Sequence, residues 1–265
     1  MNILMLGDII GPSGRKAVAK ELPNLIKKKK IDFVIVNGEN SDDSGMGITK
    51  NIVDEYLGMG VDVITSGNHI WDQKEAMNFI DSEKRLLRPI NMVNGSPGQG
   101  FGIFKSKNNT KVAVVNLMGN IFMKKCDDLF KAAKKFIETV KLKREADFII
   151  VDVHAEVTSE KMAIGHLFNG KATMVVGTHT HVPTLDCRIL NKGTAYQTDI
   201  GMCGDYNSVI GMNTENSLKM FSKDPTAVKH YPALGQATIS GLVVIADKKT
   251  GLAKNVEPIF FGGSI

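Results

Sequence analysis

The order of hydrophobic and polar residues predicts strands and helices that alternate along the chain. Short, continuous apolar runs are typical of strands buried on both faces. Such runs occupy residues 2–7, 31–37, 62–66, 111–117, 147–153 and 172–177. Apolar residues spaced three and four apart predict helices at residues 12–29, 49–59, 72–80, 129–140 and 159–169. The pattern therefore predicts an α/β protein whose sheets are covered by helices.

Cap and turn residues refine two of these boundaries. Asp72 is followed three residues later by Glu75, a spacing that resembles a capping box. We therefore expect the helix over residues 72–80 to begin at Asp72. Residues 88–102 are rich in Pro, Gly and Asn, and this composition predicts a loop.

The second half of the chain continues the same alternation. Residues 102–106 and 111–117 are joined through a short polar turn and predict a β-hairpin. The other elements expected there are a helix at residues 214–222 and strands at residues 238–246 and 253–260. No internal repeat or low-complexity linker divides the sequence, so we expect residues 1–265 to form a single domain.

Composition supports a globular protein of ordinary type. The chain has 265 residues, of which 43% are hydrophobic and 23% charged, which suffices for a full core and excludes wholesale disorder. Its cysteines, Cys126, Cys187 and Cys203, are far apart and form no C-x-x-C pair. Neither a disulfide framework nor a cysteine-based zinc site is therefore indicated, and a reducing compartment is expected.

The chain ends and the net charge bear on location and partners. Residues 1–8 lack the basic start of a signal peptide, and no apolar run approaches the roughly 20 residues that span a bilayer. We therefore expect a cytoplasmic protein without a membrane partner. A net charge of +5 favours acidic ligands, including phosphates and nucleic acids. Because the lysine clusters fall on expected helix ends and faces, solvated surface is the simpler interpretation, and RNA binding is permitted but not indicated.

Polar residues follow five of the predicted strands at the point where each strand ends. These clusters are Gly7-Asp8, Gly38-Glu39-Asn40, Gly67-Asn68-His69, His154, and Gly177-Thr178-His179-Thr180-His181. In open α/β sheets, ligands bind beyond the carboxyl ends of the strands. We therefore expect these side chains to form one site.

The residue types in these clusters are suited to binding metal ions. Asp8 and Glu39 offer carboxylate oxygens, and Glu39 could bridge two cations. Amide oxygens and imidazole nitrogens complete the candidate ligands, which are Asn40, Asn68, His154, His179 and His181. In an extended segment, residues two apart point to the same side, so His179 and His181 can face one centre. A two-metal cluster with mixed oxygen and nitrogen ligands is the prediction.

Each residue also has a simpler explanation when taken alone. A single Asp after a strand is usually a helix cap or turn residue, and Asn beside Gly usually forms a turn. A single histidine is more often structural than a ligand. The joint placement at strand ends favours the metal site, while His166 and His230 lie outside it and are expected to be structural or surface groups.

At this level of detail the sequence resembles the calcineurin-like metallophosphoesterases, and more closely their YmdB-like branch of 2′,3′-cyclic-nucleotide 2′-phosphodiesterases. The resemblance runs nearly end to end through residues 7–11, 37–40, 66–72, 152–161, 176–182 and 198–202. It implies the fold of that superfamily, in which layered β-sheets are covered by helices as an α/β/β/α sandwich.

The same resemblance implies a division of the ligands between two metals. One metal would take Asp8, Glu39, Asn40 and His181. The other would take Glu39, Asn68, His154 and His179. The sequence departs from the wider superfamily where Asp8-Ile9-Ile10 replaces Asp-x-His and where Glu39 replaces the bridging aspartate, as in the YmdB-like branch. Exchanging a histidine for an amide oxygen makes the first site harder, so iron or manganese is expected, with zinc left open.

The implied reaction is hydrolysis of a phosphodiester by a metal-bridging hydroxide. By the same resemblance, His69 would act as the general acid that protonates the leaving ribose oxygen. Two other functions stay open: a broader phosphomonoesterase or nuclease, and a regulatory phosphate-binding or RNA-binding scaffold with little turnover.

Two segments near the expected site have several interpretations. The glycines of residues 41–47 could admit a nucleotide or simply permit a turn. Residues 205–214 could cap the substrate, form a subunit contact or be a plain loop. Met212 and Met220 suit a contact in a homo-oligomer as well as a core position.

Overall fold

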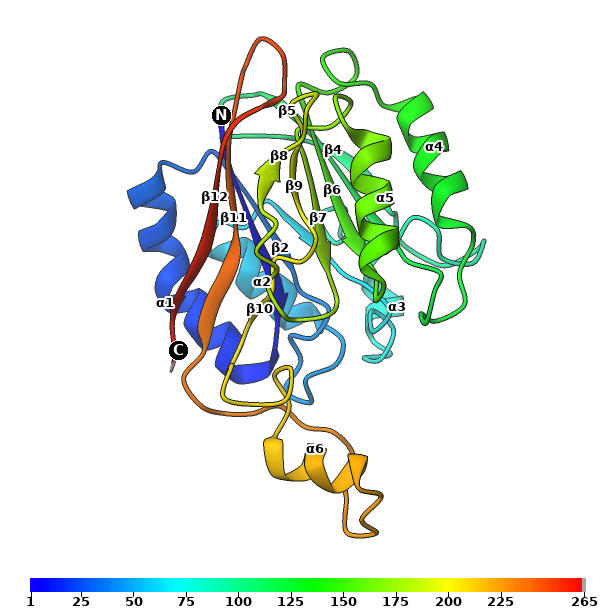
Figure 1. The fold of residues 1–265 in the computed structure, drawn as a ribbon, viewed down its shortest axis with the longest axis vertical. Coiled ribbons are helices and arrows are strands. Elements are labelled where there is room, and N and C mark those ends of the chain that lie inside the picture. The colour runs from blue at the N-terminus through cyan, green and yellow to red at the C-terminus, as the bar shows by residue number, and fades with distance from the viewer. Residues whose placement is uncertain (264–265) are drawn as a thin grey trace.

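The computed structural model describes residues 1–263, which form two β-sheets flanked by helices (Figure 1). The helices are α1 (Gly11–Lys29), α2 (Lys50–Gly58), α3 (Ala76–Phe79), α4 (Leu129–Thr139), α5 (Thr158–Phe168) and α6 (Thr214–Phe221). The strands are β1 (Asn2–Ile9), β2 (Phe33–Asn37), β3 (Val63–Thr65), β4 (Phe101–Lys105), β5 (Lys111–Met118), β6 (Phe148–His154), β7 (Met174–Thr178), β8 (Arg188–Ile189), β9 (Ala195–Gln197), β10 (Met202–Cys203), β11 (Thr238–Ala246) and β12 (Ala253–Gly262). The prediction of an α/β protein is confirmed.

The first sheet has the strand order β12-β11-β1-β2-β3, and β10 pairs with the end of β1. Its strands β1, β2 and β3 are parallel, whereas β11 runs antiparallel to β1. Helices α1 and α2 cover one face. Val18 of α1 and Tyr56 of α2 are buried in the same cluster as Leu4, Leu6 and Val36 of the sheet.

The second sheet has the order β4-β5-β6-β7-β9-β8. The predicted hairpin is confirmed as β4 and β5, which pair antiparallel, and β5, β6, β7 and β9 are parallel. Helices α4 and α5 cover the outer face of this sheet, where Phe136 and Phe168 pack against Val115 and Val151.

A central core fills the space between the two sheets. Ile3, Met5 and Phe33 of the first sheet are buried in one cluster with Val114 and Phe148 of the second. Successive side chains of a strand point to opposite faces, so each of these strands buries one row against helices and the other against the facing sheet. This double burial explains why the strands were visible in the sequence as continuous apolar runs.

The helix expected over residues 72–80 was wrong in extent. The structure has only the four-residue helix α3, and the pair Asp72 and Glu75 does not form a capping box. Asp72 instead contacts the His69 ring, and Glu75 accepts a hydrogen bond from Lys50 N (2.8 Å) at the start of α2. Because Asp72 and Glu75 make contacts with other residues, the capping box that their spacing predicted does not form.

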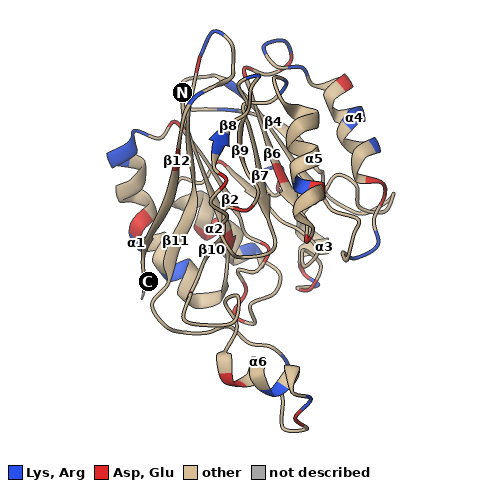
Figure 2. Ribbon diagram, in the orientation of Figure 1, with Lys and Arg blue, Asp and Glu red and all other residues tan. Residues whose placement is uncertain are grey.

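The charged surface and α6 complete the description. Lys and Arg are spread over the outer helices and loops and are interleaved with Asp and Glu (Figure 2). Helix α6 extends away from the two sheets (Figure 1) and carries the exposed side chains Leu218 and Phe221. Within residues 1–263, none of the helices has the length and apolar character that crossing a membrane requires.

Replacing Phe33 with Ala tests the central core. Phe33 is fully buried between the sheets, so we expect Phe33→Ala to lower the free energy of unfolding by about 3–5 kcal/mol. Phe221→Ala is the control, because Phe221 is 77% exposed on α6 and its truncation should change stability by less than about 0.5 kcal/mol. Urea titration followed by circular dichroism measures both, and equal losses would contradict this placement of the core.

Candidate metal centre

The strand ends of both sheets deliver the predicted ligands to one place. Asp8 lies near the end of β1, Glu39 and Asn40 follow β2, and Asn68 follows β3. From the second sheet, His154 is the last residue of β6, and His179 and His181 follow β7. The side chains of Asp8, Glu39 and His154 are fully buried. The site therefore lies where the carboxyl ends of the two sheets meet.

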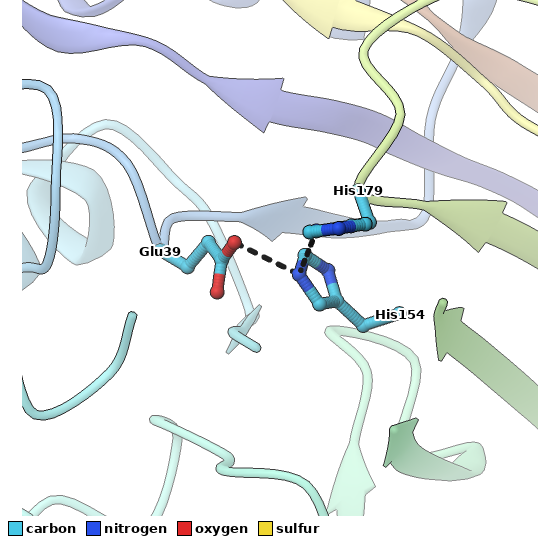
Figure 3. A group of neighbouring side chains, drawn as sticks. All are labelled: Glu39, His154 and His179. Atoms are coloured by element: carbon cyan, nitrogen blue, oxygen red, sulfur yellow. Dashed lines mark hydrogen bonds and ion pairs between the residues drawn. The ribbon is translucent and has the colours of Figure 1, made fainter. Parts of the chain in front are cut away.

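His154 Nε2 lies at the centre of one half of this site (Figure 3). It is 2.8 Å from Glu39 Oε1, 3.1 Å from Asn68 Oδ1 and 3.1 Å from His179 Nδ1. One donor atom from each of Glu39, His154 and His179 lies within 4.8 Å of the other two. Ligands of a single transition metal ion surround it at about 2.0–2.2 Å, so this spacing is suited to one cation.

The other half contains Asp8, Asn40 and His181. Asn40 Nδ2 lies 3.3 Å from His181 Nε2 and 3.4 Å from Glu39 Oε1. Asp8 Oδ1 lies 3.9 Å from His181 Nε2 and 3.8 Å from His154 Nδ1. Glu39 therefore contacts members of both halves, which is the position a bridging carboxylate needs.

Hydrogen bonds fix which nitrogen of two imidazoles faces the site. Thr178 Oγ1 donates to Asp152 Oδ1 (2.7 Å) and lies 2.9 Å from His154 Nδ1, so its remaining role toward that ring is to accept. His181 Nδ1 lies 2.8 Å from the carbonyl oxygen of Ile210, which can only accept. In both rings Nδ1 therefore carries a proton, and Nε2 is the nitrogen that faces the site and would bind a cation after giving up any proton of its own.

The contact through Ile210 also bears on residues 205–214. This segment supplies the carbonyl that orients His181, and Asp205 accepts hydrogen bonds from Asn207 N (2.9 Å) and Gly235 N (2.9 Å). The segment is thus tied to the site and to the chain beyond α6. Sequence alone had not distinguished this role from that of a plain loop.

His179 and His181 face the site for a different reason from the one predicted. The prediction rested on an extended segment, but the two residues have φ angles of 95° and 63°. These left-handed conformations are uncommon for residues other than glycine and cost energy that the surroundings must supply. The expectation of an extended backbone was wrong, although both rings do approach the other candidate ligands.

Buried carboxylates dominate the electrostatics of the site. Burial raises the pKa of Asp8, because an apolar environment disfavours the ionised form. Burial acts in the same direction on Glu39, but His154 outweighs it and lowers the pKa of Glu39 to about 2. Burial alone would lower the pKa of His154, yet Glu39 and Asp8 raise it to about 9. His179 is left neutral, since burial and then His154 lower its pKa to about 3.

One atom in this arrangement is left without a partner. Asp8 Oδ2 accepts a hydrogen bond from His179 N (3.1 Å), whereas Oδ1 is buried and has no hydrogen-bond partner among residues 1–263. Burying an uncompensated carboxylate oxygen is costly unless it is paired or binds a metal. This unpartnered carboxylate oxygen and the imidazole nitrogens that face it are what a cation-binding site requires.

His69 lies beside this cluster and has partners that sequence reasoning missed. Its Nδ1 lies 2.7 Å from Asp72 Oδ2, and its backbone N–H donates to Glu39 Oε2 (3.1 Å). Lys124 Nζ donates both to Asp72 Oδ1 (3.1 Å) and to the carbonyl of Asn68 (2.8 Å). Asp72 was predicted to be a helix cap, and its spacing of three from His69 was the signal that could have revealed the pair. No sequence pattern distinguishes Lys124 from an ordinary surface lysine, so its contact with Asp72 could not have been predicted.

The two remaining histidines lie outside the candidate metal site. His166 is exposed on α5 and His230 is half-buried, as expected for groups outside the site.

The chain is similar to known proteins over nearly its whole length. A family model described as YmdB-like protein matches residues 4–259. The 2′,3′-cyclic-nucleotide 2′-phosphodiesterase of Bacillus subtilis (strain 168) is 44% identical over 259 residues, which cover 98% of this chain and 96% of that protein. A solved structure of a hypothetical protein from Thermus thermophilus superposes with a TM-score of 0.90 at 37% identity and covers 100% of both chains. A structure described as a novel phosphatase, from Mycoplasma pneumoniae, gives 0.89 at 36% identity and covers 99% of this chain and 93% of its own.

The named relatives define a class of hydrolytic phosphoesterase enzymes. The chain belongs to the YmdB-like family within that class.

Gly67→Ala tests whether the cluster holds metal. A Cβ atom at Gly67 would lie 2.2 Å from His154 Nε2 and 2.4 Å from Glu39 Oε2, so both groups must move. We expect bound metal, measured by elemental analysis after purification without chelators, to fall well below the content of the wild-type protein. Gly58→Ala is the matched control, because its Cβ meets nothing within 4 Å on α2. It should keep its metal and gain up to about 1 kcal/mol of stability. Unchanged metal content in Gly67→Ala would place the metal site elsewhere.

Proposed function

We propose that the protein is a dinuclear metal-dependent phosphodiesterase that hydrolyses 2′,3′-cyclic nucleotides, and that residues 1–265 form one domain with the calcineurin-like metallophosphoesterase sandwich. The observation that carries the proposal is the buried cluster around His154 Nε2, with Glu39, Asn68 and His179 at 2.8–3.1 Å. One metal would be held by Asp8, Glu39, Asn40 and His181. The other would be held by Glu39, Asn68, His154 and His179.

Cations held by these ligands would supply Lewis-acid chemistry, which lowers the pKa of water and stabilises the attacking and leaving oxygens of an in-line displacement. The first ligand set has three oxygen donors and one nitrogen, and the second has two of each. Hard oxygen donors favour iron or manganese over zinc in the first site. The protein's own contribution is to keep both carboxylates dry and oriented.

In this proposal His69 delivers the proton that the leaving oxygen needs. The contact between its Nδ1 and Asp72 (2.7 Å) fixes the ring and leaves Nε2 as the nitrogen that exchanges a proton. Although partial burial opposes it, hydrogen bonds from His69 and Lys124 lower the pKa of Asp72. Asp72 therefore stays ionised and holds the His69 ring in position by this contact. Water adds to phosphorus and releases one proton to solvent, the bond from phosphorus to O2′ breaks, and O2′ takes a proton from His69. His69 then regains a proton from solvent, and the product is the 3′-phosphate.

The substrate class rests on the comparison with the Bacillus subtilis protein, which matches over 98% of this chain and is named for 2′,3′-cyclic nucleotides. A broader phosphomonoesterase or nuclease is the second candidate, because the Mycoplasma pneumoniae structure is described as a phosphatase. A regulatory scaffold with little turnover is the third, and the site gives it no specific support.

Substrate choice is tested with a panel. Wild-type protein and Asp8→Ala are assayed on 2′,3′-cyclic AMP, 3′,5′-cyclic AMP, bis-p-nitrophenyl phosphate and p-nitrophenyl phosphate. We expect the highest kcat/KM on 2′,3′-cyclic AMP and its loss in Asp8→Ala. Preference for the monoester would favour the phosphomonoesterase, and no metal-dependent turnover on any of them would leave only the scaffold.

Chelation tests the metal requirement directly. Dialysis against EDTA should abolish turnover, because both proposed cations stabilise the transition state, and adding Mn²⁺ or Fe²⁺ should restore it. The readout is activity together with metal content by elemental analysis. Full activity in metal-free protein would be incompatible with the proposal.

His69→Ala separates proton transfer from metal binding. We expect it to keep its metals and to lose about 10²–10⁴-fold in kcat, the usual contribution of a general acid. Asp72→Asn should lower kcat less, because it weakens the contact that orients the His69 ring but leaves the ring in place. His166→Ala, which alters an exposed histidine on α5, is the control and should retain wild-type turnover. Loss of metal in His69→Ala would instead make His69 a ligand.

A further inference from the structure

A four-residue segment, Thr198–Gly201, connects the two sheets directly beside the site. It leaves β9 in the second sheet and enters β10 in the first. Ile200 N donates to the carbonyl oxygen of Gly177 in β7 (3.0 Å), and Ser240 Oγ donates to the carbonyl oxygen of Ile200 (2.6 Å). We call Thr198–Gly201 the crossing segment.

Glycines allow the crossing segment to lie against both ligand-bearing strands. A Cβ at Gly7, next to Asp8 in β1, would lie 1.9 Å from the carbonyl oxygen of Gly201. A Cβ at Gly177 in β7 would lie 1.8 Å from the carbonyl oxygen of Thr198. Because the obstructing atoms are backbone, no side chain is compatible with either position. The backbone of the crossing segment therefore packs directly against the end of β1 and the end of β7.

The crossing segment also contains a buried ion pair that the reaction does not use. Asp199 Oδ2 lies 2.7 Å from Lys161 Nζ, and both side chains are only 1% exposed. Lys161 comes from α5, and a Cβ at Gly177 would lie 2.6 Å from its Cδ. A buried pair of this kind contributes little net stability compared with an apolar replacement, so stability is a weak reason for its presence.

One carboxylate oxygen of Asp199 accepts hydrogen bonds from the residue that lies between two candidate ligands. Oδ2 accepts hydrogen bonds from Thr180 N (3.3 Å) and Thr180 Oγ1 (2.7 Å), while Oδ1 accepts from Gly201 N (2.8 Å). Thr180 stands between His179 and His181, the residues with φ angles of 95° and 63°. Such conformations persist only where surrounding contacts impose them, and Asp199 supplies two of these contacts.

We propose that Asp199, held by Lys161, is a positioning residue: it holds Thr180 so that His179 and His181 keep the left-handed backbone that directs their rings at the metals. The inference rests on the proposed function, since it requires that these histidines bind metal. It assigns a role to residues 161 and 199, which belong to sequence blocks that the ligand set and His69 leave unexplained. Loss of such supporting contacts typically weakens metal binding by about 10- to 100-fold.

The double variant Lys161→Met/Asp199→Asn distinguishes positioning from stability. Removing one partner alone leaves an uncompensated buried charge and destabilises the fold, whereas removing both charges is tolerated far better. An amide at position 199 cannot accept hydrogen bonds on both of its ends, so either the contact with Thr180 or the contact with Gly201 is lost. We expect a midpoint of thermal unfolding within a few degrees of wild type and a Kd for Mn²⁺ that is about 10- to 100-fold higher.

Thr180→Val is a milder test in which the fold should be intact. It removes the hydroxyl that donates to Asp199 and keeps the backbone contact, so we expect a severalfold rise in the Kd for Mn²⁺. Thr194→Val is the matched control, because Thr194 is buried directly before β9 and its Oγ1 donates to the carbonyl of Ala172 (2.7 Å), away from the site. It should lower the midpoint of unfolding and leave the Kd unchanged.

Both tests are made on full-length protein stripped with EDTA, with Mn²⁺ binding measured by titration calorimetry and unfolding by differential scanning calorimetry. Wild-type Kd values in the double variant, or equal changes in Thr180→Val and Thr194→Val, would overturn the inference while leaving the proposed function intact. Absence of Mn²⁺ binding by the wild-type protein would overturn the proposed function, and this inference with it.

Discussion

Two carboxylates held in the dry junction between the sheets are the constraint on which the site depends. Asp8 and Glu39 are fully buried, and one oxygen of Asp8 has no hydrogen-bond partner within the described part of the chain. Within the protein, His181 and then His154 favour the ionised form of Asp8, and His154 favours that of Glu39, although burial of His154 opposes its own protonation. Such an arrangement is unfavourable for a chain without cations and favourable for one that binds them. The neighbouring amides and imidazoles then serve as ligands in place of water.

Because the candidate ligands come from both sheets, the geometry of the site depends on how the sheets pack together. Asp8, Glu39 and Asn68 belong to the first sheet, and the three histidines belong to the second. The apolar cluster that contains Ile3 and Phe148 holds the sheets face to face, so it also sets the spacing of the ligands. Packing errors of a fraction of an ångström at the core are transmitted to the site, because protein interiors are close-packed.

Sequence reasoning reached the strands and candidate ligands because each has a local signature. Strands buried on both faces form apolar runs, and polar residues after them are conspicuous. Asp72 was misassigned because a cap and an ion pair with His69 share the same three-residue spacing. The left-handed backbone of His179 could not be predicted, since it is imposed by contacts distant in sequence. Lys161 and Asp199 have the local pattern of surface charges, and only the fold makes them a buried pair.

The position of β1 has a consequence for the order of events during folding. This strand lies between β2 and β11, and Leu4 pairs with Val243 across almost the whole length of the chain. Contacts between residues so distant in sequence slow folding, because a long loop must close before they form. A ribosome must therefore release most of the polypeptide before the strand that carries Asp8 can be enclosed. In the proposed site, binding of cations in the native geometry would therefore come late in folding, after β1 is enclosed.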